Sequence, residues 1–362
     1  GGTVLTWGYG TGFRLGTGHR NTQWSPPPET EFQGPKGWDS DGAGPAAGAG
    51  EKKDDAGEEQ TTKKDDANPW DIAQLACGAM HTVALTRGGD VYTWGSSEFG
   101  QTGSGYAKLD LWKPKMIPRD RLHHKIQCIA AGYDHCLAVA TTGELYGWGR
   151  GGQGQLGTGR AKDVFEPTLL TITGVSGVES VAAGEEHSAA IADGKLYTWG
   201  SGEFGKLGHG PDTNGTQLVP KHVINFDADV KCQQVACGMS HTCVIAQGVS
   251  GQGGELYSFG GGWYGRLGVN DTNNKNIPTK VDLYGSLNEL ADRVVCGAFH
   301  TAIITASKEL AMWGRKECVC EAENVQAPKK FAHMGEKGEN AIKILAVACG
   351  ELHTIVATQE GE

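Results

Sequence analysis

Short runs of alternating apolar and polar residues recur along the chain, and glycines separate them. In segments 81–86 (HTVALT) and 90–95 (DVYTWG), apolar side chains fall at nearly every second position, which predicts β-strands. Gly88 and Gly89 lie between these segments, and paired glycines favour a tight hairpin turn. The pattern therefore predicts a strand, a turn and a second strand.

This strand–turn–strand unit recurs along the chain. Segments that resemble 77–95 begin at residues 131, 183, 237, 296 and 349, and successive histidines lie 52 to 59 residues apart. The last copy stops after its first half, and residues 1–8 (GGTVLTWG) match the missing second half. The recurring residues are His81, His135, His187, His241, His300 and His353, with Trp7, Trp94, Trp148, Trp199, Phe259 and Trp313.

Two further features suggest about four strands in each unit. A short apolar stretch such as 125–132 (KIQCIAAG) precedes the next histidine, and a glycine follows the aromatic residue after nine positions in most units. Repeated units of this size, with two chain ends that complete one unit, predict a closed architecture. We therefore expect an all-β chain that folds as one β-propeller over residues 1–362, with six blades and a ring closed by pairing of the N- and C-terminal strands.

One interval in the repeat is too long. From Trp7 to His81 is 74 residues, whereas the equivalent later intervals are 39 to 42 residues. Residues 34–67 supply the excess, lack apolar periodicity and alternate blocks of Lys with blocks of Asp and Glu. We expect this segment to be a disordered, low-complexity insertion within the first repeat.

The repeat motif points to a known family. Segments 145–159 (LYGWGRGGQGQLGTG) and 196–210 (LYTWGSGEFGKLGHG) combine Leu-Tyr-x-Trp-Gly with Gly-x-Leu-Gly, and a Gly-x-x-His segment precedes each. This combination resembles the regulator-of-chromosome-condensation repeat family over nearly the whole chain outside the insertion. The resemblance implies a propeller that usually has seven blades, so seven remains the alternative to six. Segment 312–324 departs from the pattern because it lacks the Gly-x-Leu-Gly turn.

The amino-acid composition limits the kinds of partner and the cellular compartment that we expect for this chain. The chain has 32 Lys+Arg against 42 Asp+Glu, a net charge of −10 and no basic block, which does not favour nucleic-acid binding. It contains no apolar stretch long enough to cross a bilayer. Ten cysteines without paired spacing favour a reducing intracellular compartment, cytoplasmic or nuclear. We expect a monomeric propeller, and the missing initiator Met is consistent with a piece of a longer protein.

The recurrence of cysteines and histidines also indicates whether they are catalytic, metal-binding or structural. Cys296 and three other cysteines share one repeat position with Ala131 and Ala183, so that position requires a small residue rather than a thiolate. The histidines fall one per blade, too far apart for a single four-coordinate metal site, and we expect them to be structural. Cys318 and Cys320 are expected at the surface. We predict no catalytic residue, no metal and no cofactor.

The residues that vary between repeats are the candidate functional residues. The two positions between glycine and histidine differ in every unit and are expected in loops on one face of the ring. Some of these side chains could instead plug the central channel. The predicted partner-binding residues are Met80, Tyr133, Asp134, Glu185, Glu186, Met239, Phe299 and Leu352.

These residues are consistent with two functions. The first is a non-catalytic scaffold that binds a protein partner through this apolar and acidic face. The second, implied by the resemblance, is nucleotide exchange on a Ran-type small GTPase, because Asp134 matches the Gly-x-Asp-His pattern of the family's exchange surface. The doubled histidine and protruding hairpin expected for exchange have no counterpart here. The family's ultraviolet-sensing branch is disfavoured because no tryptophan lies between glycine and histidine in any unit.

Overall fold

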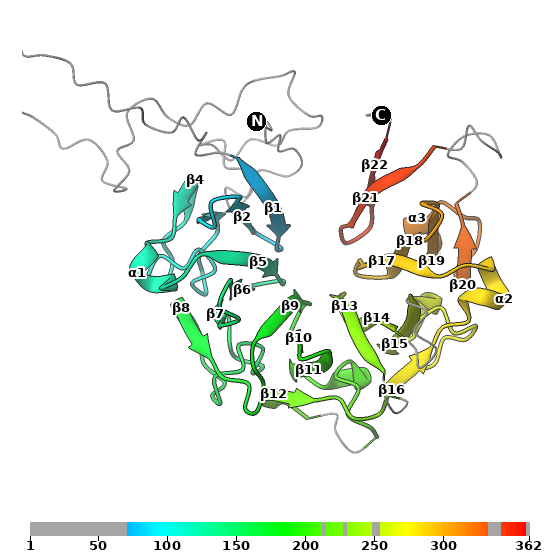
Figure 1. The fold of residues 1–362 in the computed structure, drawn as a ribbon, viewed down its shortest axis with the longest axis horizontal. Coiled ribbons are helices and arrows are strands. Elements are labelled where there is room, and N and C mark those ends of the chain that lie inside the picture. The colour runs from blue at the N-terminus through cyan, green and yellow to red at the C-terminus, as the bar shows by residue number, and fades with distance from the viewer. Residues whose placement is uncertain (1–70, 212–214, 227–229, 248–253, 332–341, 360–362) are drawn as a thin grey trace, which may run out of the picture.

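The computed structural model describes residues 71–211, 215–226, 230–247, 254–331 and 342–359. In these parts of the chain, six antiparallel sheets are arranged around a common centre, each as one blade of a propeller (Figure 1). The first five sheets have four strands, and the sixth has the two strands β21 and β22. The all-β propeller expected from the repeats is therefore confirmed.

The strands of each sheet follow one another in sequence order from the centre outwards (Figure 1). The first blade comprises β1 (Ile72–Cys77), β2 (His81–Thr86), β3 (Val91–Gly95) and β4 (Leu111–Met116). The second comprises β5 (Ile126–Ala131), β6 (His135–Ala140), β7 (Leu145–Gly149) and β8 (Val164–Leu170). The third comprises β9 (Val178–Ala183), β10 (His187–Ala192), β11 (Lys195–Gly200) and β12 (Gln217–His222).

The remaining blades repeat this order. The fourth comprises β13 (Lys231–Cys237), β14 (His241–Gln247), β15 (Glu255–Gly260) and β16 (Lys275–Lys280). The fifth comprises β17 (Ala291–Cys296), β18 (His300–Thr305), β19 (Leu310–Gly314) and β20 (Val325–Lys330). The sixth comprises β21 (Ile344–Cys349) and β22 (Thr354–Thr358).

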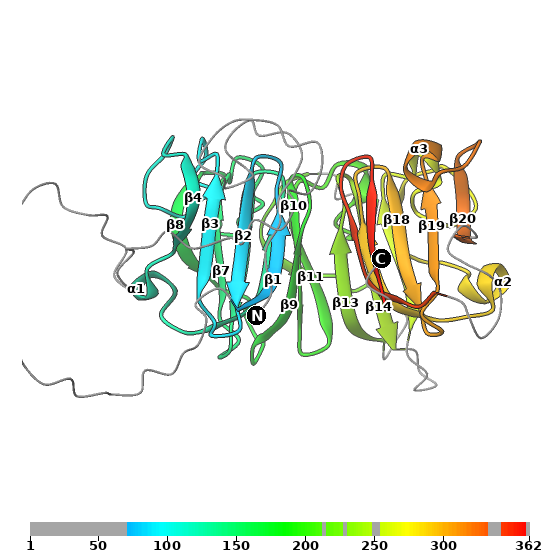
Figure 2. The ribbon, with the colours of Figure 1, turned by 90° about the horizontal axis from the view of Figure 1, so that it is seen from above.

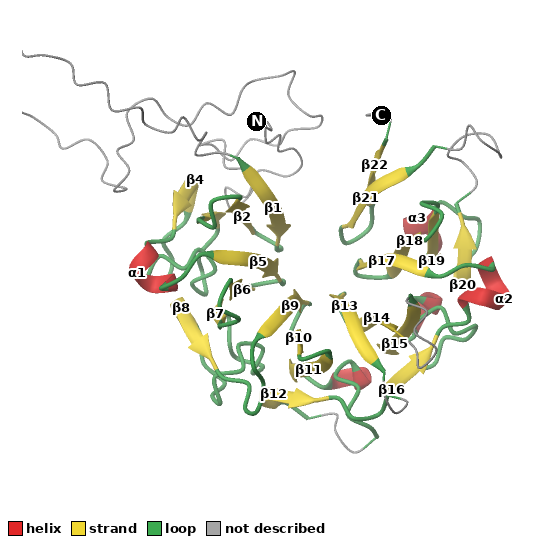
Figure 3. Ribbon diagram, in the orientation of Figure 1, coloured by secondary structure: helices red, strands yellow, loops and turns green. Residues whose placement is uncertain are grey.

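Short helical turns lie in the connections between strands (Figure 3). None of the helices in the described residues is long and apolar enough to cross a membrane. The helical turns are α1 (Arg119–Leu122), η2 (Glu203–Gly205), η3 (Trp263–Gly265), α2 (Leu283–Leu287) and α3 (Lys316–Val319).

The strand that begins at the recurring histidine is second from the centre, and the innermost strand is the apolar stretch that precedes it. In β2, β6, β10 and β18 every residue is buried, including the polar ones. Both faces of these strands are covered by neighbouring sheets, so alternation in sequence does not produce an exposed face. The hydrophobic core accordingly lies between blades: Trp148 of the second blade packs with Val83 and Leu85 of the first.

The blade count and the closure of the ring remain predictions. The segment expected to pair with β22, residues 1–8, lies outside the described residues, as does the predicted insertion at 34–67. Trp7 also lies outside them. Cys318 is buried at 3% exposure because α3 turns its side chain inward, so the expectation of a surface cysteine there is wrong, whereas Cys320 is exposed.

Candidate functional site

Two sets of loops form one face of the propeller. The first set holds the two residues before each histidine, and the second set follows the recurring aromatic-glycine pair. Backbone hydrogen bonds tie the two sets together, as in Ser96 N to Met80 O at 2.8 Å and Arg315 N to Phe299 O at 3.0 Å. Figure 2 shows this end of the sheets at the top, where α3 also lies. We call this surface the ring face.

The residues predicted for partner binding differ in accessibility. Tyr133 and Leu352 are exposed, at 51% and 48%, and Met80 is exposed at 37%. Asp134 is buried. The partly buried residues are Glu185, Glu186, Met239 and Phe299.

Acidic residues of the second and third blades gather on the ring face. Asp134 accepts a hydrogen bond from Gln101 Nε2 at 2.9 Å, and Arg150 lies 3.8 Å from Asp134 and 3.9 Å from Glu186. Burial raises the pKa of Asp134, and the contacts with Gln101 and Arg150 offset part of that rise. The Asp134 carboxylate is thus held by internal partners.

The carboxylate of Glu185 is influenced by other negative charges. Partial burial raises the pKa of Glu185, and the carboxylates of Glu186 and Glu351 raise it further. Glu351 belongs to the loop before β22, so the sixth blade contributes a carboxylate to the same face of the ring. We call Glu185, Glu186 and Glu351 the acidic centre.

Two cations lie beneath the ring face. Lys206 and Arg266 are 2% and 0% exposed, and no carboxylate of the described residues lies within ion-pair distance of either. Burial lowers the pKa of both groups, that of Arg266 to about 10. Arg266 donates from Nε to Gly261 O and from Nη1 to Ala298 O, both at 2.7 Å. A side chain at Gly261 would collide with the guanidinium, since its Cβ would lie 2.6 Å from Nη2.

Aromatic side chains and the guanidinium groups of Arg266 and Arg315 pack against one another. The guanidinium of Arg266 lies 4.9 Å from the ring centre of Trp263, and that of Arg315 lies 5.3 Å from Tyr264 and 5.4 Å from Phe299. Edge contacts join Phe204 to Trp263 and Tyr264 to Phe299, at 4.4 and 5.7 Å between ring centres. The aromatic cluster consists of Phe204, Trp263, Tyr264, Phe299, Arg266 and Arg315.

The backbone holds two of these rings outward. Phe204 and Tyr264 have φ of 61° and 63°, in the left-handed region that L-residues rarely adopt. Such a conformation costs on the order of 1 kcal/mol or more and is frequent at functional sites. Phe204, Trp263 and Tyr264 are 36%, 40% and 37% exposed. The η2 and η3 turns therefore present aromatic side chains to solvent.

The recurring histidines lie below the ring face and join neighbouring blades. In each case Nε2 contacts the side chain directly after the next blade's histidine: His135 to Ser188 at 2.8 Å, and His241 to Thr301 at 2.9 Å. The hydroxyls of Ser188, Thr242 and Thr301 in turn donate to a loop carbonyl of the preceding blade, as from Thr301 to Arg266 O at 2.8 Å. The same carbonyl accepts the indole N–H of Trp313 at 2.9 Å. The remaining contacts are His81 to Cys136, His187 to Thr242 and His300 to Thr354.

The protonation of these histidines follows from their burial. Burial lowers the pKa of His81 to about 4 and that of His135 to about 3, so both rings are neutral near pH 7. A neutral ring that donates from Nε2 carries no proton on Nδ1, and Nδ1 of both residues has no hydrogen-bond partner. An uncharged, enclosed imidazole is a structural group. His353 is exposed, and its role stays a prediction.

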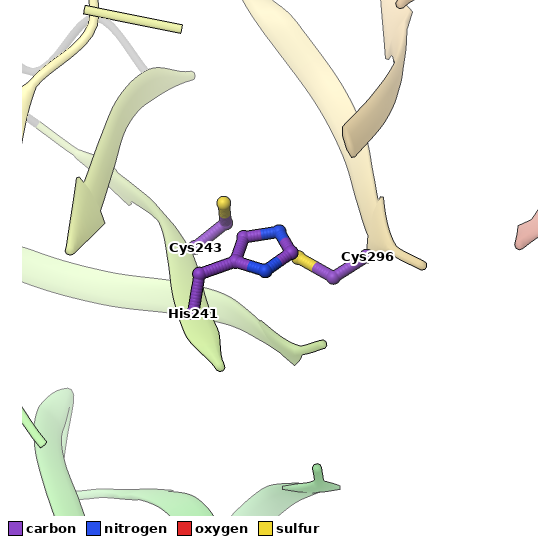
Figure 4. Close-up of side chains that lie close together, drawn as sticks. All are labelled: His241, Cys243 and Cys296. Carbon is purple, nitrogen blue, oxygen red and sulfur yellow. The ribbon is translucent and has the colours of Figure 1, made fainter. Parts of the chain in front are cut away.

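One histidine has two thiols beside it. A nitrogen of His241 and the sulfurs of Cys243 and Cys296 lie within 4.8 Å of one another between β14 and β17 (Figure 4). These donor types bind Zn²⁺ in other proteins. Here His241 Nε2 already contacts Thr301, and burial raises the pKa of Cys296 well above its usual value. The thiol is therefore protonated, and the arrangement fits packing between blades better than metal binding.

Sequence reasoning selected Phe299 but missed the other members of the aromatic cluster and their neighbours on the ring face. Arg150, Trp263 and Arg315 lie in the loops after the aromatic-glycine pair, and their side chains differ from blade to blade. The signal was the same variability that selected the residues before each histidine. In these loops the recurring glycines mask the variability of the side chains between them.

Comparisons with known proteins agree with this fold. The chain is 36% identical over 295 residues to the ultraviolet-B receptor UVR8 of Arabidopsis thaliana, covering 80% of this chain and 63% of that protein. It is 33% identical over 211 residues to the probable E3 ubiquitin-protein ligase HERC4 of Rattus norvegicus, covering 58% of this chain and 19% of that protein. It thus spans less than two thirds of the length of either relative.

A solved structure and a family model extend the comparison. The structure of human WBSCR16 superposes with a TM-score of 0.67 at 26% identity, over 79% of this chain and 71% of that one. The model of the RCC1-like domain matches residues 40–362. This chain is a member of the RCC1-like domain family.

Proposed function

We propose that this chain is a non-catalytic interaction module that binds a protein partner through the ring face. The observation that carries the proposal is the position of three exposed aromatic residues, Phe204, Trp263 and Tyr264, beside the acidic centre. Exposed aromatic residues grouped with charged ones are typical of protein interfaces. The variable loops surround this group, whereas the repeated residues lie below it.

The titratable residues support a binding role rather than catalysis. His135, His187 and His241 are fully buried, and each is hydrogen-bonded to the next blade. A general base must reach the proton that it removes, and these rings have no access to solvent. The activities named for UVR8 and HERC4 belong to longer proteins and are not assigned to this chain.

The test compares substitutions on opposite faces. Met80→Asp and Tyr133→Asp place a carboxylate on the ring face, whereas Ile224→Asp makes the same change in the β12–β13 loop, where the side chain is 75% exposed. We expect proteins captured from the source cells by the unsubstituted chain to be retained by Ile224→Asp and lost with the two ring-face variants. Equal capture by all four chains would contradict binding through the ring face.

Exchange on a Ran-type GTPase is the alternative function, and Asp134 is its discriminating residue. Its carboxylate is 7% exposed and is held by Gln101 and Arg150, so it is not free to engage a partner. We expect no acceleration of fluorescent GDP release from Ran. An acceleration that Asp134→Ala abolishes would favour exchange over simple binding.

A further inference from the structure

The aromatic cluster is a preorganised surface for an apolar group. Trp263 packs on Arg266 and against Phe204, so its ring is fixed while 40% of the side chain stays exposed. Tyr264 is fixed similarly by Arg315 and Phe299. A side chain that is already ordered loses little conformational entropy when a partner covers it. Trp263 and Tyr264 therefore have the properties of binding anchors.

The charges that a partner can reach around the acidic centre are mostly negative, whereas Lys316 of α3 adds an exposed cation beside Arg315 at the edge of the aromatic cluster. Lys206 and Arg266 are buried, Arg150 is shared between two carboxylates, and Arg315 pairs with Glu317 at 2.8 Å. By contrast, the carboxylates of the acidic centre are partly or fully exposed, and Glu203 next to the aromatic cluster is exposed. Charge complementarity then favours a cationic group in the partner.

The acidic centre and the aromatic cluster adjoin one another. Ser201 N donates to Glu186 O at 2.9 Å, and Ser201 lies in the same β11–β12 connection as Phe204, so Glu186 of the acidic centre lies close to the aromatic cluster. Glu203 directly precedes Phe204 within η2. One short segment of a partner can therefore contact both parts.

The aromatic cluster and the acidic centre favour different side chains of the partner. Arg266 covers one face of Trp263, and its positive charge weakens the attraction of the ring for a second cation. Arg266 Nη2 has no hydrogen-bond partner, but it is enclosed, so a carboxylate of a partner does not reach it. The aromatic cluster thus suits an aromatic or aliphatic side chain, and the acidic centre suits a basic one.

We propose that the ring face recognises a protein segment in which an aromatic or aliphatic anchor lies close to Lys or Arg. The anchor packs on Trp263 and Tyr264, and the basic group pairs with Glu185 and Glu186. This inference rests on the proposed function and specifies the chemistry of its partner. A second copy of the chain is a poorer occupant, because its net charge of −10 and its own acidic centre would face like charges.

The experiment selects peptides from a random twelve-residue phage library on the immobilised chain and measures the best binders by fluorescence anisotropy. We expect the selected sequences to carry Lys or Arg within a few residues of an aromatic or leucine side chain. Trp263→Ala and the double substitution Glu185→Gln/Glu186→Gln should each weaken binding about tenfold, which corresponds to about 1.4 kcal/mol. Raising NaCl from about 50 mM to about 500 mM should weaken it further, because salt screens exposed charges.

Controls separate recognition from folding. Ile224→Ala, on the opposite face, should leave the affinity unchanged, and the thermal midpoints of Ile224→Ala and of Glu185→Gln/Glu186→Gln should match that of the unsubstituted chain. The Glu→Gln changes preserve shape, so they test charge even where Trp263→Ala alters packing.

Each other outcome overturns the inference. Selection of acidic peptides, binding insensitive to both sets of substitutions, or no enrichment over the bare support would each contradict it. The proposed function fails separately, when Met80→Asp and Tyr133→Asp do not reduce capture of cellular proteins. Acidic peptides that are lost with Trp263→Ala would refute the partner chemistry and leave binding through the ring face intact.

Discussion

We call the contact between a recurring histidine and the hydroxyl or thiol of the next blade a joint. Replacing Thr301 by Val removes one hydroxyl from the joint between the fourth and fifth blades. The hydroxyl contacts His241 Nε2 at 2.9 Å and donates to Arg266 O at 2.8 Å, and the side chain is 0% exposed. Val has nearly the same shape and also favours β-strands, so little cavity results. The substitution therefore isolates the hydrogen bonds of one joint.

The expected loss of stability depends on which buried polar group the substitution leaves without a hydrogen-bond partner. Arg266 O keeps its bond from Trp313, so the main cost is the buried N–H of His241, which loses its acceptor. Leaving a buried donor without a partner costs about 1–3 kcal/mol. We expect the free energy of unfolding to fall by that amount, measured from the urea midpoint with an unchanged m value.

An exposed threonine provides the matched control. Thr142 is exposed and makes a long contact with Glu144 at 3.4 Å, so Thr142→Val should change the free energy of unfolding by less than about 0.5 kcal/mol. A double-mutant cycle of Thr301→Val with His241→Ala should give a coupling of about 1 kcal/mol. If Thr301→Val cost no more than Thr142→Val, or the cycle gave no coupling, the joints would not stabilise the ring.

Three further predictions concern the same joints. Burial lowers the pKa of His81 and His300 to about 4 and that of His135 to about 3, so unfolding takes up protons below the usual pKa of 6.5. Stability should therefore be fully present above pH 6.5 and fall towards pH 4, by up to about 1.4 kcal/mol per pH unit for each histidine; a flat series of urea midpoints between pH 7 and pH 5 would contradict this. Gly132→Ala should lower the thermal midpoint, because the new Cβ would lie 2.3 Å from His135 Cε1, whereas Gly152→Ala, with no atom within 4 Å, should not. EDTA should leave the midpoint unchanged, since His241 Nε2 is committed to Thr301, and a lower midpoint would indicate a bound ion.

The sequence predicted the local structure of the repeat but not what each repeat contacts. The recurring histidine and the glycine three residues before it predicted the start of a strand, and β6 begins at His135 as expected. The acceptor of His135 is Ser188, which lies 53 residues away. A repeat pattern defines equivalent positions, whereas the partner across a blade interface depends on how blades stack in space.

The candidate site was predicted only in part. Met80 and Tyr133 were selected because they vary among repeats, and both are exposed. Trp263 and Arg266 vary in the same way, but their interaction depends on Gly261, whose missing side chain makes room for the guanidinium. Within the part of the chain that the structure describes, such an arrangement occurs once, so no periodic signal marks it.

The joints between blades have a consequence for how such a chain grows. In the second to fifth blades, a histidine contacts the following blade and a hydroxyl or thiol contacts the histidine of the preceding blade, as Thr242 contacts His187 while His241 contacts Thr301. A duplicated blade therefore arrives with two compatible ends and requires no newly evolved contact. Genes for such chains can gain or lose a unit by a single in-frame duplication or deletion, while the ring face changes independently in its loops.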